Sequence, residues 1–429
     1  MIEMTRYRLS DLYELSSGIS TKPAQAGHGY PFCSFSTVFN NSFLPDELPD
    51  LMDTSDQERI VYSIKAGDVF LTRTSETVDE LGMSSVAVKD YPNATYSGFL
   101  KRLRPVSDKA YPKYMAMFFR GDYFRKTVTN KAVMTLRASF NEDTFNDISV
   151  VLPPIEVQRF VGDLFYDIEC HSRNNNAICA SLEAMTKLLY DYWFVQFDFP
   201  DENGGPYKSS GGKMIWNDEL KREIPEGWEV TRLGDLISYN RGVSYTGNDM
   251  CDSGTPIISL ASIDRAGRYI PDGIKYYNQE YPSSKVLQPY DLVMANTDMT
   301  QERAVMGKII FVPDIFDGDI LSTHHITKIT ISDELKSYLM MTTQTDWFHK
   351  YIKGFSSGTN VLGMDMVGFE DYMLLCPSQK ILLRFNRIIY DIYANIFETY
   401  KENFELASLR DYLLPMLMNG QVKVGKVGA

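Results

Sequence analysis

Residues 155–195 read IEVQRFVGDLFYDIECHSRNNNAICASLEAMTKLLYDYWFV and carry apolar side chains every three or four positions. Residues 380–418 carry the same pattern. This spacing, sustained over four heptads, is typical of a long helix that packs against another helix. We therefore expect two helices that form a coiled coil through the following residues: Val161, Leu164, Ile168, Ile178, Leu182, Met185 and Leu189 in the first, and Phe385, Ile388, Ile392, Leu406, Leu409 and Leu413 in the second.

Polar residues interrupt both apolar stripes midway. They are His171, Asn175, Asn395, Thr399 and Glu402. Polar side chains at such positions commonly fix the register of a helix pair, and we expect that role or a water-filled gap here. The heptads by themselves do not decide whether the helices run parallel or antiparallel.

The two helical stretches belong to an internal duplication. One shift of 224 residues relates them, because 385 − 161 and 413 − 189 both equal 224. The same shift places RLSDL at 8–12 on RLGDL at 232–236, and DYF at 122–124 on DWF at 346–348. Gly67-Asp68 falls on Tyr290-Asp291 with a slip of one residue. A repeat of this length indicates a duplicated domain, because solenoid repeats have 20 to 50 residues.

Each copy is predicted to be a globular α+β region followed by one long helix. Short β-rich runs alternate with turn clusters in both globular regions, and a helix is expected at 113–127. The stretch after the first helix is rich in glycine, proline and serine, which predicts a flexible connector. The expected order is a first globular region (1–152), a first helix (153–199), a connector (200–226), a second globular region (227–376), a second helix (377–419) and a tail (420–429).

Composition narrows the class of protein. The chain has 429 residues and is 44% hydrophobic, with no apolar run of membrane-spanning length and no secretory segment at its start, so we expect a cytoplasmic protein without membrane contact. Its five cysteines include no C-x-x-C pair, and the pair His324-His325 lacks the spacing of zinc ligands. We expect no metal site.

Catalytic motifs are almost absent. The sequence contains neither G-x-G-x-x-G nor a P-loop, so it predicts no nucleotide or methyl-donor site. GFSSG at 354–358 matches the G-x-S-x-G motif of serine hydrolases, with Ser356 as nucleophile. That motif exposes its serine only on a strand-to-helix turn, whereas residues 346–353 are predicted to be helical. A polar glycine loop is the preferred interpretation, and a hydrolase remains an alternative.

Charge is unevenly distributed. The formal net charge is −13, yet residues 59–140 contain fourteen Lys or Arg against seven Asp or Glu. Residues 227–375 contain twelve basic and nineteen acidic residues. A local basic excess suits contact with phosphates, although basic clusters often remain ordinary solvated surface.

Several motifs resemble those of the specificity subunit of type I restriction-modification systems. LPPIEVQ at 152–158 is similar to the L-P-P-L-x-E-Q junction of that family. The stretch YDYWFVQFDFP at 190–200, continuing through KMIW at 213–216 to IPEGW at 224–228, resembles the central connector of such subunits. The resemblance covers essentially the whole chain. The second junction, LCPSQK at 375–380, departs from the family pattern because it has one proline and no acidic-Gln pair.

The resemblance implies a non-catalytic, sequence-specific DNA-binding subunit that takes part in DNA methylation and phage defence. Each globular region would be a target recognition domain that reads one half of a bipartite sequence. The two helices would pair antiparallel as a spacer, and about 35 helical residues extend roughly 50 Å, or about 15 base-pair rises. Two DNA methyltransferase (modification) subunits and the restriction/translocase subunits would be its partners. S-adenosylmethionine, ATP and Mg would bind to those partners, and no cofactor would bind to this chain.

Candidate DNA contacts are taken from charge and loops. Arginine would read guanine and asparagine would read adenine if they reach the major groove. The candidates are Arg73, Thr74, Lys101, Arg102 and Arg137 in the first region, and Arg241, Asn296, Thr297, Lys353, Ser357, Thr359 and Asn360 in the second. The main alternative function is a protein-interaction scaffold in which the duplicated domains bind proteins.

Overall fold

The structure, a computed structural model, describes residues 4–75, 81–131, 133–134, 138–139 and 142–418. It divides into two compact units. The first unit comprises Met1–Arg173 and Glu405–Ala429, and the second comprises Asn174–Phe404. Each long helix is therefore shared: one part packs in the first unit and the other part in the second.

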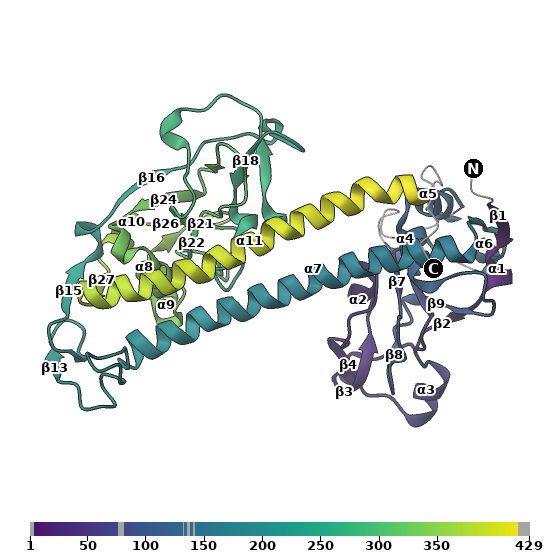
Figure 1. Ribbon diagram of the computed structural model, residues 1–429, viewed down its shortest axis with the longest axis horizontal. Helices are drawn as coiled ribbons and strands as arrows, with labels where there is room; N and C mark the ends of the chain where they lie inside the picture. Colours follow the sequence, from purple (N-terminus) through teal and green to yellow (C-terminus); the bar gives the residue numbers. More distant parts are fainter. Residues whose placement is uncertain (1–3, 76–80, 132, 135–137, 140–141, 419–429) are drawn as a thin grey trace, which may run out of the picture. The chain divides into compact units, whose positions relative to one another are not determined.

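The first unit combines short strands with short helices (Figure 1). Its strands form a four-stranded sheet in the order β2-β9-β5-β7, three-stranded sheets β4-β3-β8 and β10-β11-β6, and the pair β1-β12. The strands are β1 (Thr5–Arg8), β2 (Tyr13–Ser17), β3 (Ala26–Cys33), β4 (Asp50–Met52), β5 (Val69–Thr72), β6 (Thr74–Ser75), β7 (Ser84–Val86), β8 (Thr95–Tyr96), β9 (Leu100–Pro105), β10 (Val133–Met134), β11 (Ala138–Ser139) and β12 (Ser149–Leu152). The α-helices are α1 (Leu9–Leu12), α2 (Phe35–Asn40), α3 (Asp56–Val61), α4 (Pro112–Arg120), α5 (Asp122–Lys131) and α6 (Glu142–Asp147).

The second unit has a corresponding set of elements. Its sheets are β16-β24-β20-β22, β17-β19-β18-β23 and β21-β26-β25, with the pairs β15-β27 and β13-β14. The strands are β13 (Met214–Asn217), β14 (Arg222–Pro225), β15 (Glu229–Arg232), β16 (Ser238–Arg241), β17 (Met250–Cys251), β18 (Thr255–Ile258), β19 (Lys275–Tyr277), β20 (Leu292–Ala295), β21 (Thr297–Asp298), β22 (Ile309–Phe311), β23 (Leu321–Ser322), β24 (Ile326–Thr330), β25 (Ser356–Ser357), β26 (Leu362–Met364) and β27 (Met373–Cys376). The α-helices are α8 (Lys336–Thr343), α9 (Asp346–Lys353) and α10 (Met366–Glu370).

The two units repeat one topology. In both, the strand that precedes a long helix pairs antiparallel with a much earlier strand, as β12 with β1 and β27 with β15. Both contain a four-stranded sheet of equivalent order, and both contain one parallel strand pair, β3 with β8 and β18 with β23. The predicted duplication of α+β regions is confirmed.

A matching turn shows that the alignment holds in detail. Gly67 and Tyr290 both adopt a left-handed backbone, with φ of 89° and 64°. In each unit the side-chain carboxylate of the next residue accepts a 2.8 Å hydrogen bond from the backbone N–H three residues earlier. Asp68 accepts from Lys65, and Asp291 accepts from Gln288. The expected slip of one residue between these turns is therefore correct.

The long helices are α7 (Ile155–Tyr190), which continues as a π-helix over Asp191–Val195, and α11 (Gln379–Met418). Within the second unit they run antiparallel. Asn175 Nδ2 donates to Glu402 Oε2 at 2.9 Å, whereas the Phe194 ring, near the other end of α7, meets the Phe385 ring at 4.8 Å. The prediction of an antiparallel helix pair with a polar register contact is confirmed there.

The predicted apolar seam is correct at some positions and wrong at others. Val161, Ile168 and Phe385 are buried, but Ile178, Met185 and Leu409 are exposed. The side chains that are buried instead include Cys179 and Thr186 on α7, and Ile389, Ile396 and Tyr400 on α11. Each helix packs both on its partner helix and on a globular core, so its buried face is wider than a strict coiled-coil seam.

The connector also differs from the expected flexible segment. Asp201 Oδ1 accepts 2.8 Å hydrogen bonds from the backbone of Asn203 and Gly205, which forms a compact turn. Strands β13 and β14 pair as an antiparallel hairpin. Phe199 stacks on Trp228 with ring centroids 5.0 Å apart. Glycine and proline therefore form defined turns in this segment. Buried aromatic rings hold both of its ends in place.

None of the helices in the described part of the chain combines the length and the hydropathy that crossing a bilayer requires.

Candidate nucleic-acid interface

A small sheet in the second unit collects four of the predicted DNA contacts. Thr297 lies in β21 and Ser357 in β25, while Thr359 and Asn360 lie in the exposed turn between β25 and β26. Gly358 in this turn has φ +129°, and a Cβ there would lie 2.3 Å from the Val361 carbonyl oxygen. Only glycine fits that backbone, so the G-x-S-x-G match reflects a turn requirement.

Two histidines and a tyrosine adjoin this sheet. The Oγ1 of Thr297 lies 2.9 Å from Nδ1 of His325 in a hydrogen bond. The His325 ring lies 4.0 Å from that of His324, and the Tyr245 ring lies 5.4 Å from the His324 ring. Burial, and then the neighbouring His324, lower the pKa of His325. In the sequence the pair His324-His325 shows only that zinc-ligand spacing is missing, and its place directly before strand β24 is the signal that points to this site.

Asn296 does not serve as predicted. It is 3% exposed, and its Nδ2 donates to Thr327 Oγ1 at 2.6 Å and to the His324 carbonyl at 3.2 Å. An amide held in this way organises the strand ends and is not available to read adenine. Asn296 is therefore removed from the candidate contacts.

The two predicted cations of the second unit lie outside the small sheet's strands, although the Lys353 carbonyl accepts a hydrogen bond from Ser356 of β25 at 2.8 Å. Arg241 is exposed at the end of β16, where its carbonyl accepts a 2.6 Å hydrogen bond from Lys285 Nζ. Lys353 is half-buried at the end of α9, and its carbonyl accepts from Arg303 at 3.2 Å. Both are placed as surface cations within the second unit, and neither is excluded as a DNA contact.

In the first unit, Arg73 and Lys101 form a small cationic surface. Arg73 is exposed, and its backbone N–H donates to the Phe99 carbonyl at 2.8 Å. Lys101 Nζ donates to Ser17 Oγ at 2.7 Å. Burial, and then the charge of Arg73, lower the pKa of Lys101. The mutual repulsion of these two cations is relieved by an anion, such as a phosphate.

Arg102 is a wrong prediction. Its side chain is buried against Tyr96, and its Nη1 donates to the Ser63 carbonyl at 2.8 Å. Arg104 in the same strand pairs with Asp68 at 2.6 Å. The basic run at 101–104 therefore divides between surface and core, because alternate residues of a strand point to opposite faces and neighbouring loops cover one face.

The remaining predicted contacts of the first unit are Thr74 and Arg137. Thr74 lies in β6, which pairs with β11 as β21 pairs with β26. Arg137 lies outside the described residues. The strand order β10-β11-β6 in the first unit corresponds to β25-β26-β21 in the second, so both units present the same small sheet.

The serine hydrolase alternative fails on local geometry. Ser356 follows helix α9 and begins strand β25, which is the reverse of the strand-to-helix turn that a nucleophile elbow requires. Its hydroxyl donates to the Lys353 carbonyl at 2.8 Å. Across the described residues, no group of three His, Cys, Asp or Glu side chains is arranged to hold a metal ion.

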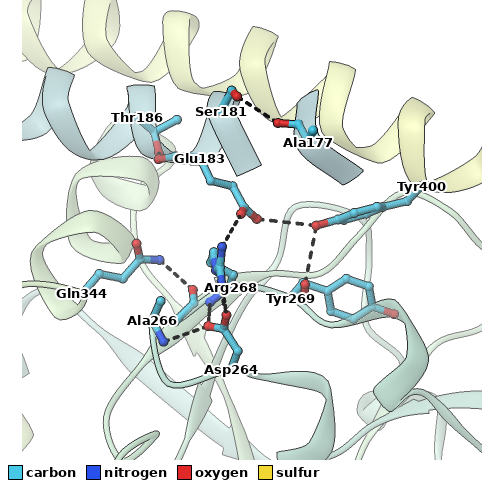
Figure 2. Close-up of polar contacts among 11 residues, drawn as sticks. Ala177, Ser181, Glu183, Thr186, Asp264, Ala266, Arg268, Tyr269, Gln344 and Tyr400 are labelled. Atoms are coloured by element: carbon cyan, nitrogen blue, oxygen red, sulfur yellow. Dashed lines mark hydrogen bonds and ion pairs between the residues drawn. The ribbon is translucent and has the colours of Figure 1, made fainter. Parts of the chain in front are cut away.

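A charged network attaches a loop of the second unit to both long helices (Figure 2). Glu183 on α7 lies 3.5 Å from Arg268, which also pairs with Asp264 at 2.6 Å. Tyr400 on α11 donates to Glu183 and to the Tyr269 carbonyl, both at 3.5 Å. The network fixes the orientation of the 264–269 loop against the helix pair.

Comparison with known proteins identifies relatives over most of the chain, although no family model matches it. The specificity subunit of the type I restriction enzyme HindI of Haemophilus influenzae is 22% identical over 461 aligned positions, covering 92% of this chain and 95% of the relative. That of MjaIX from Methanocaldococcus jannaschii is 22% identical over 353 positions, covering 79% and 75%.

A crystal structure of the S subunit of a type I restriction-modification system from M. genitalium aligns with a TM-score of 0.58 and 11% identity. It covers 97% of this chain and 96% of that chain, so the fold is shared. The relatives are specificity subunits, which agrees with the predicted non-catalytic role. By sequence and by fold, the chain is a homologue of the specificity subunits of type I restriction enzymes.

Proposed function

We propose that this chain reads a bipartite DNA sequence and directs methyltransferase and restriction subunits to it. The observation that carries the proposal is the repeated small sheet, β10-β11-β6 and β21-β26-β25, in two units of equivalent topology. Two similar surfaces in one chain suit a target with two half-sites. The predicted boundaries, 1–152 and 227–376, remain our proposal for the two target recognition domains.

The polar groups at these surfaces have the chemistry of base and phosphate recognition. In the second unit the exposed side chains are hydroxyls and an amide, from Ser357, Thr359 and Asn360. In the first unit the exposed Arg73 and the half-buried Lys101 supply cations. Hydroxyls and amides hydrogen-bond to base edges, and cations neutralise phosphates, so we infer that the first unit contributes more of the electrostatic attraction.

The acidic total charge fits a subunit that acts with partners. A partner that closes around the duplex can supply further phosphate neutralisation. In this proposal the methyltransferase subunits bind S-adenosylmethionine and flip the target base, and the restriction/translocase subunits use ATP and Mg. This chain supplies the sequence recognition, and it acts in the cytoplasm where the DNA lies.

Repeated apolar surfaces support two copies of one methyltransferase partner. Leu188 on α7 and Tyr412 on α11 are each 69% exposed, and 412 − 188 equals 224. Each unit also has a pocket beside the end of a long helix, of about 530 Å³ in the first and about 300 Å³ in the second. Five residues that line the first pocket correspond under the same shift to five that line the second: Phe118, Tyr123, Val151, Leu414 and Met418 with Thr342, Trp347, Leu375, Tyr190 and Phe194.

Exposed apolar side chains that recur at equivalent positions are typical of interaction surfaces. We therefore place the two methyltransferase subunits on the outer helix faces, with the connector around 192–200 contributing to one of these surfaces. The protein-scaffold alternative shares these surfaces but requires no DNA contact.

Base-resolved methylation sequencing tests the proposed function. The host genome is sequenced with the gene for this chain intact and deleted, in a strain that retains the methyltransferase subunit. We expect methylation at one bipartite motif to disappear on deletion and to return on complementation. Persistence of every methylated motif would refute the DNA-reading function and favour the protein scaffold, which a pull-down then tests.

A further inference from the structure

Phe99 and His325 occupy equivalent positions in the two units. The Phe99 carbonyl accepts the backbone N–H of Arg73 at 2.8 Å, and the His325 carbonyl accepts that of Asn296 at 3.0 Å. An isolated parallel bridge lies two residues before each position, Ile19 with Ser97 and Val243 with Thr323. The duplication thus places one ring, a benzyl group or an imidazole, at the same point of each unit.

A close backbone approach fixes this point in both units. A Cβ on Gly18 would lie 2.1 Å from the Ser97 carbonyl oxygen, and one on Gly242 would lie 2.4 Å from that of Thr323. Both distances are far below any allowed contact, so only glycine fits at each crossing. The positions of the residues that follow are therefore determined by the backbone and are the same in the two copies.

The surroundings of Phe99 are those of a binding residue. Phe99 is 61% exposed, although strand β9, which begins at the next residue, contributes several buried side chains to the core. Arg73 lies beside Phe99 through the backbone hydrogen bond, and Lys101 follows Phe99 by two residues along the chain. An exposed aromatic ring between two cations suits a polyanion that also offers apolar surface, as DNA does through its bases.

The surroundings of His325 differ in chemistry. Its Nδ1 is engaged with Thr297 Oγ1, and its ring packs beside His324. Burial lowers the pKa of His325, so the imidazole is neutral at neutral pH. Nε2 is then the ring nitrogen left to exchange a hydrogen bond with a ligand, and the Thr297 contact holds the ring that presents it.

We propose that Phe99 and His325 each contact a base, one in each half-site of the DNA target. This assignment rests on the proposed function. Phe99 makes an apolar contact with a thymine methyl group, and His325 forms a hydrogen bond through Nε2 with a base edge. The two half-sites therefore differ in chemistry at equivalent positions: one is read by shape and apolar contact, the other by hydrogen bonding.

The assignment is tested with Phe99→Ala and His325→Ala in the full chain, assembled with its methyltransferase subunits. Methylation sequencing should show that Phe99→Ala relaxes the motif in one half-site only, and that His325→Ala relaxes the other half-site only. In competition binding with duplexes altered at one base pair at a time, each variant should lose about tenfold discrimination at one position.

Ile60→Ala is the matched control for Phe99→Ala, and Val367→Ala is the matched control for His325→Ala. Each control removes an exposed apolar side chain from a helix of the same unit as the residue under test, and both should retain the parental motif. His325→Gln keeps a hydrogen-bonding group and should relax the motif less than His325→Ala does. Unchanged discrimination by both alanine variants in the binding assay would overturn the assignment. Absence of any bipartite motif with the parental chain would instead refute the proposed function.

Discussion

The carboxylate of Glu183 on α7 lies 3.5 Å from the guanidinium of Arg268 in the 264–269 loop of the same unit. Tyr400 on α11 donates to the same carboxylate. A single acidic group thus joins two helices and one loop of the second unit (Figure 2). Burial raises the pKa of Glu183 to about 7, against the opposing effect of Arg268.

This carboxyl group predicts a pH-dependent stability. Because folding raises its pKa from the ordinary 4.5 to about 7, Glu183 favours the folded state below pH 4.5, and that contribution is lost as the pH rises to about 7. The loss amounts to at most about 3 kcal/mol. Thermal unfolding of the parental chain and of Glu183→Gln between pH 4.5 and 8 measures it. The difference between the two should change across this window, and parallel profiles would contradict the prediction.

The buried Asn175 predicts a specific contribution to the helix pair. Its Nδ2 donates to Glu402 at 2.9 Å and to Asn403 Oδ1 at 3.0 Å. Asn175→Ala removes both hydrogen bonds and should lower the free energy of unfolding by about 1–3 kcal/mol, measured by urea denaturation. Asn174→Ala changes an exposed neighbour on the same helix and should have little effect. Equal effects of the two variants would argue against a register contact.

Replacing the equivalent aspartates of the two units should lower the free energy of unfolding by unequal amounts. Asp68 is fully buried and pairs with Arg104 at 2.6 Å, whereas Asp291 retains some exposure and pairs with Lys328 at 2.6 Å. Asp68→Asn leaves the guanidinium without its charge partner and should cost about 3–5 kcal/mol of unfolding free energy. Asp291→Asn should cost less, because the Asp291 side chain keeps 16% exposure, so its ion pair is less completely desolvated than that of Asp68. Denaturation of both variants under one condition gives the comparison, and a larger cost for Asp291→Asn would reverse it.

Sequence reasoning succeeded where a residue's role depends on its local pattern. The 224-residue shift correctly paired DYF with DWF and, with a slip of one residue, Asp68 with Asp291, because a duplicated fold keeps its turns and helix starts. The polar interruption at Asn175 and Glu402 correctly indicated a register contact, since two polar residues in apolar stripes stabilise a helix pair only when they meet.

It failed where the role depends on what covers a side chain. Arg102 and Asn296 lie in stretches with the composition of a binding loop, yet neighbouring strands and loops bury both. Ile178 and Met185 follow the heptad and are exposed, because the globular core competes with the partner helix for the buried face. The surroundings of His325 are not evident from the sequence, since Thr297 and Tyr245, which lie beside it, are far away along the chain.

The cations of the first unit predict the salt dependence of DNA binding. If Arg73 and Lys101 contact phosphates, Arg73→Ala and Lys101→Ala should each weaken binding to all sequences and reduce the slope of log K against log salt by about 0.9. Titration of labelled duplex between 50 and 200 mM salt, about the range over which such contacts are measured, gives the slope. Arg102→Met should instead lower stability and leave the slope unchanged. A slope change with Arg102→Met alone would reverse these roles.

The repeated exposed residues predict the stoichiometry of the partner. Leu188→Asp places a charge in one proposed docking surface and Tyr412→Asp places one in the other, so each single variant should bind one methyltransferase subunit where the parental chain binds two. The double variant should bind none, since desolvating an unpaired carboxylate at both interfaces is unfavourable. Mass measurement of the purified complexes counts the subunits. Ala180→Asp, at another exposed position of α7, should retain both copies, and two bound copies in the double variant would place the partner elsewhere.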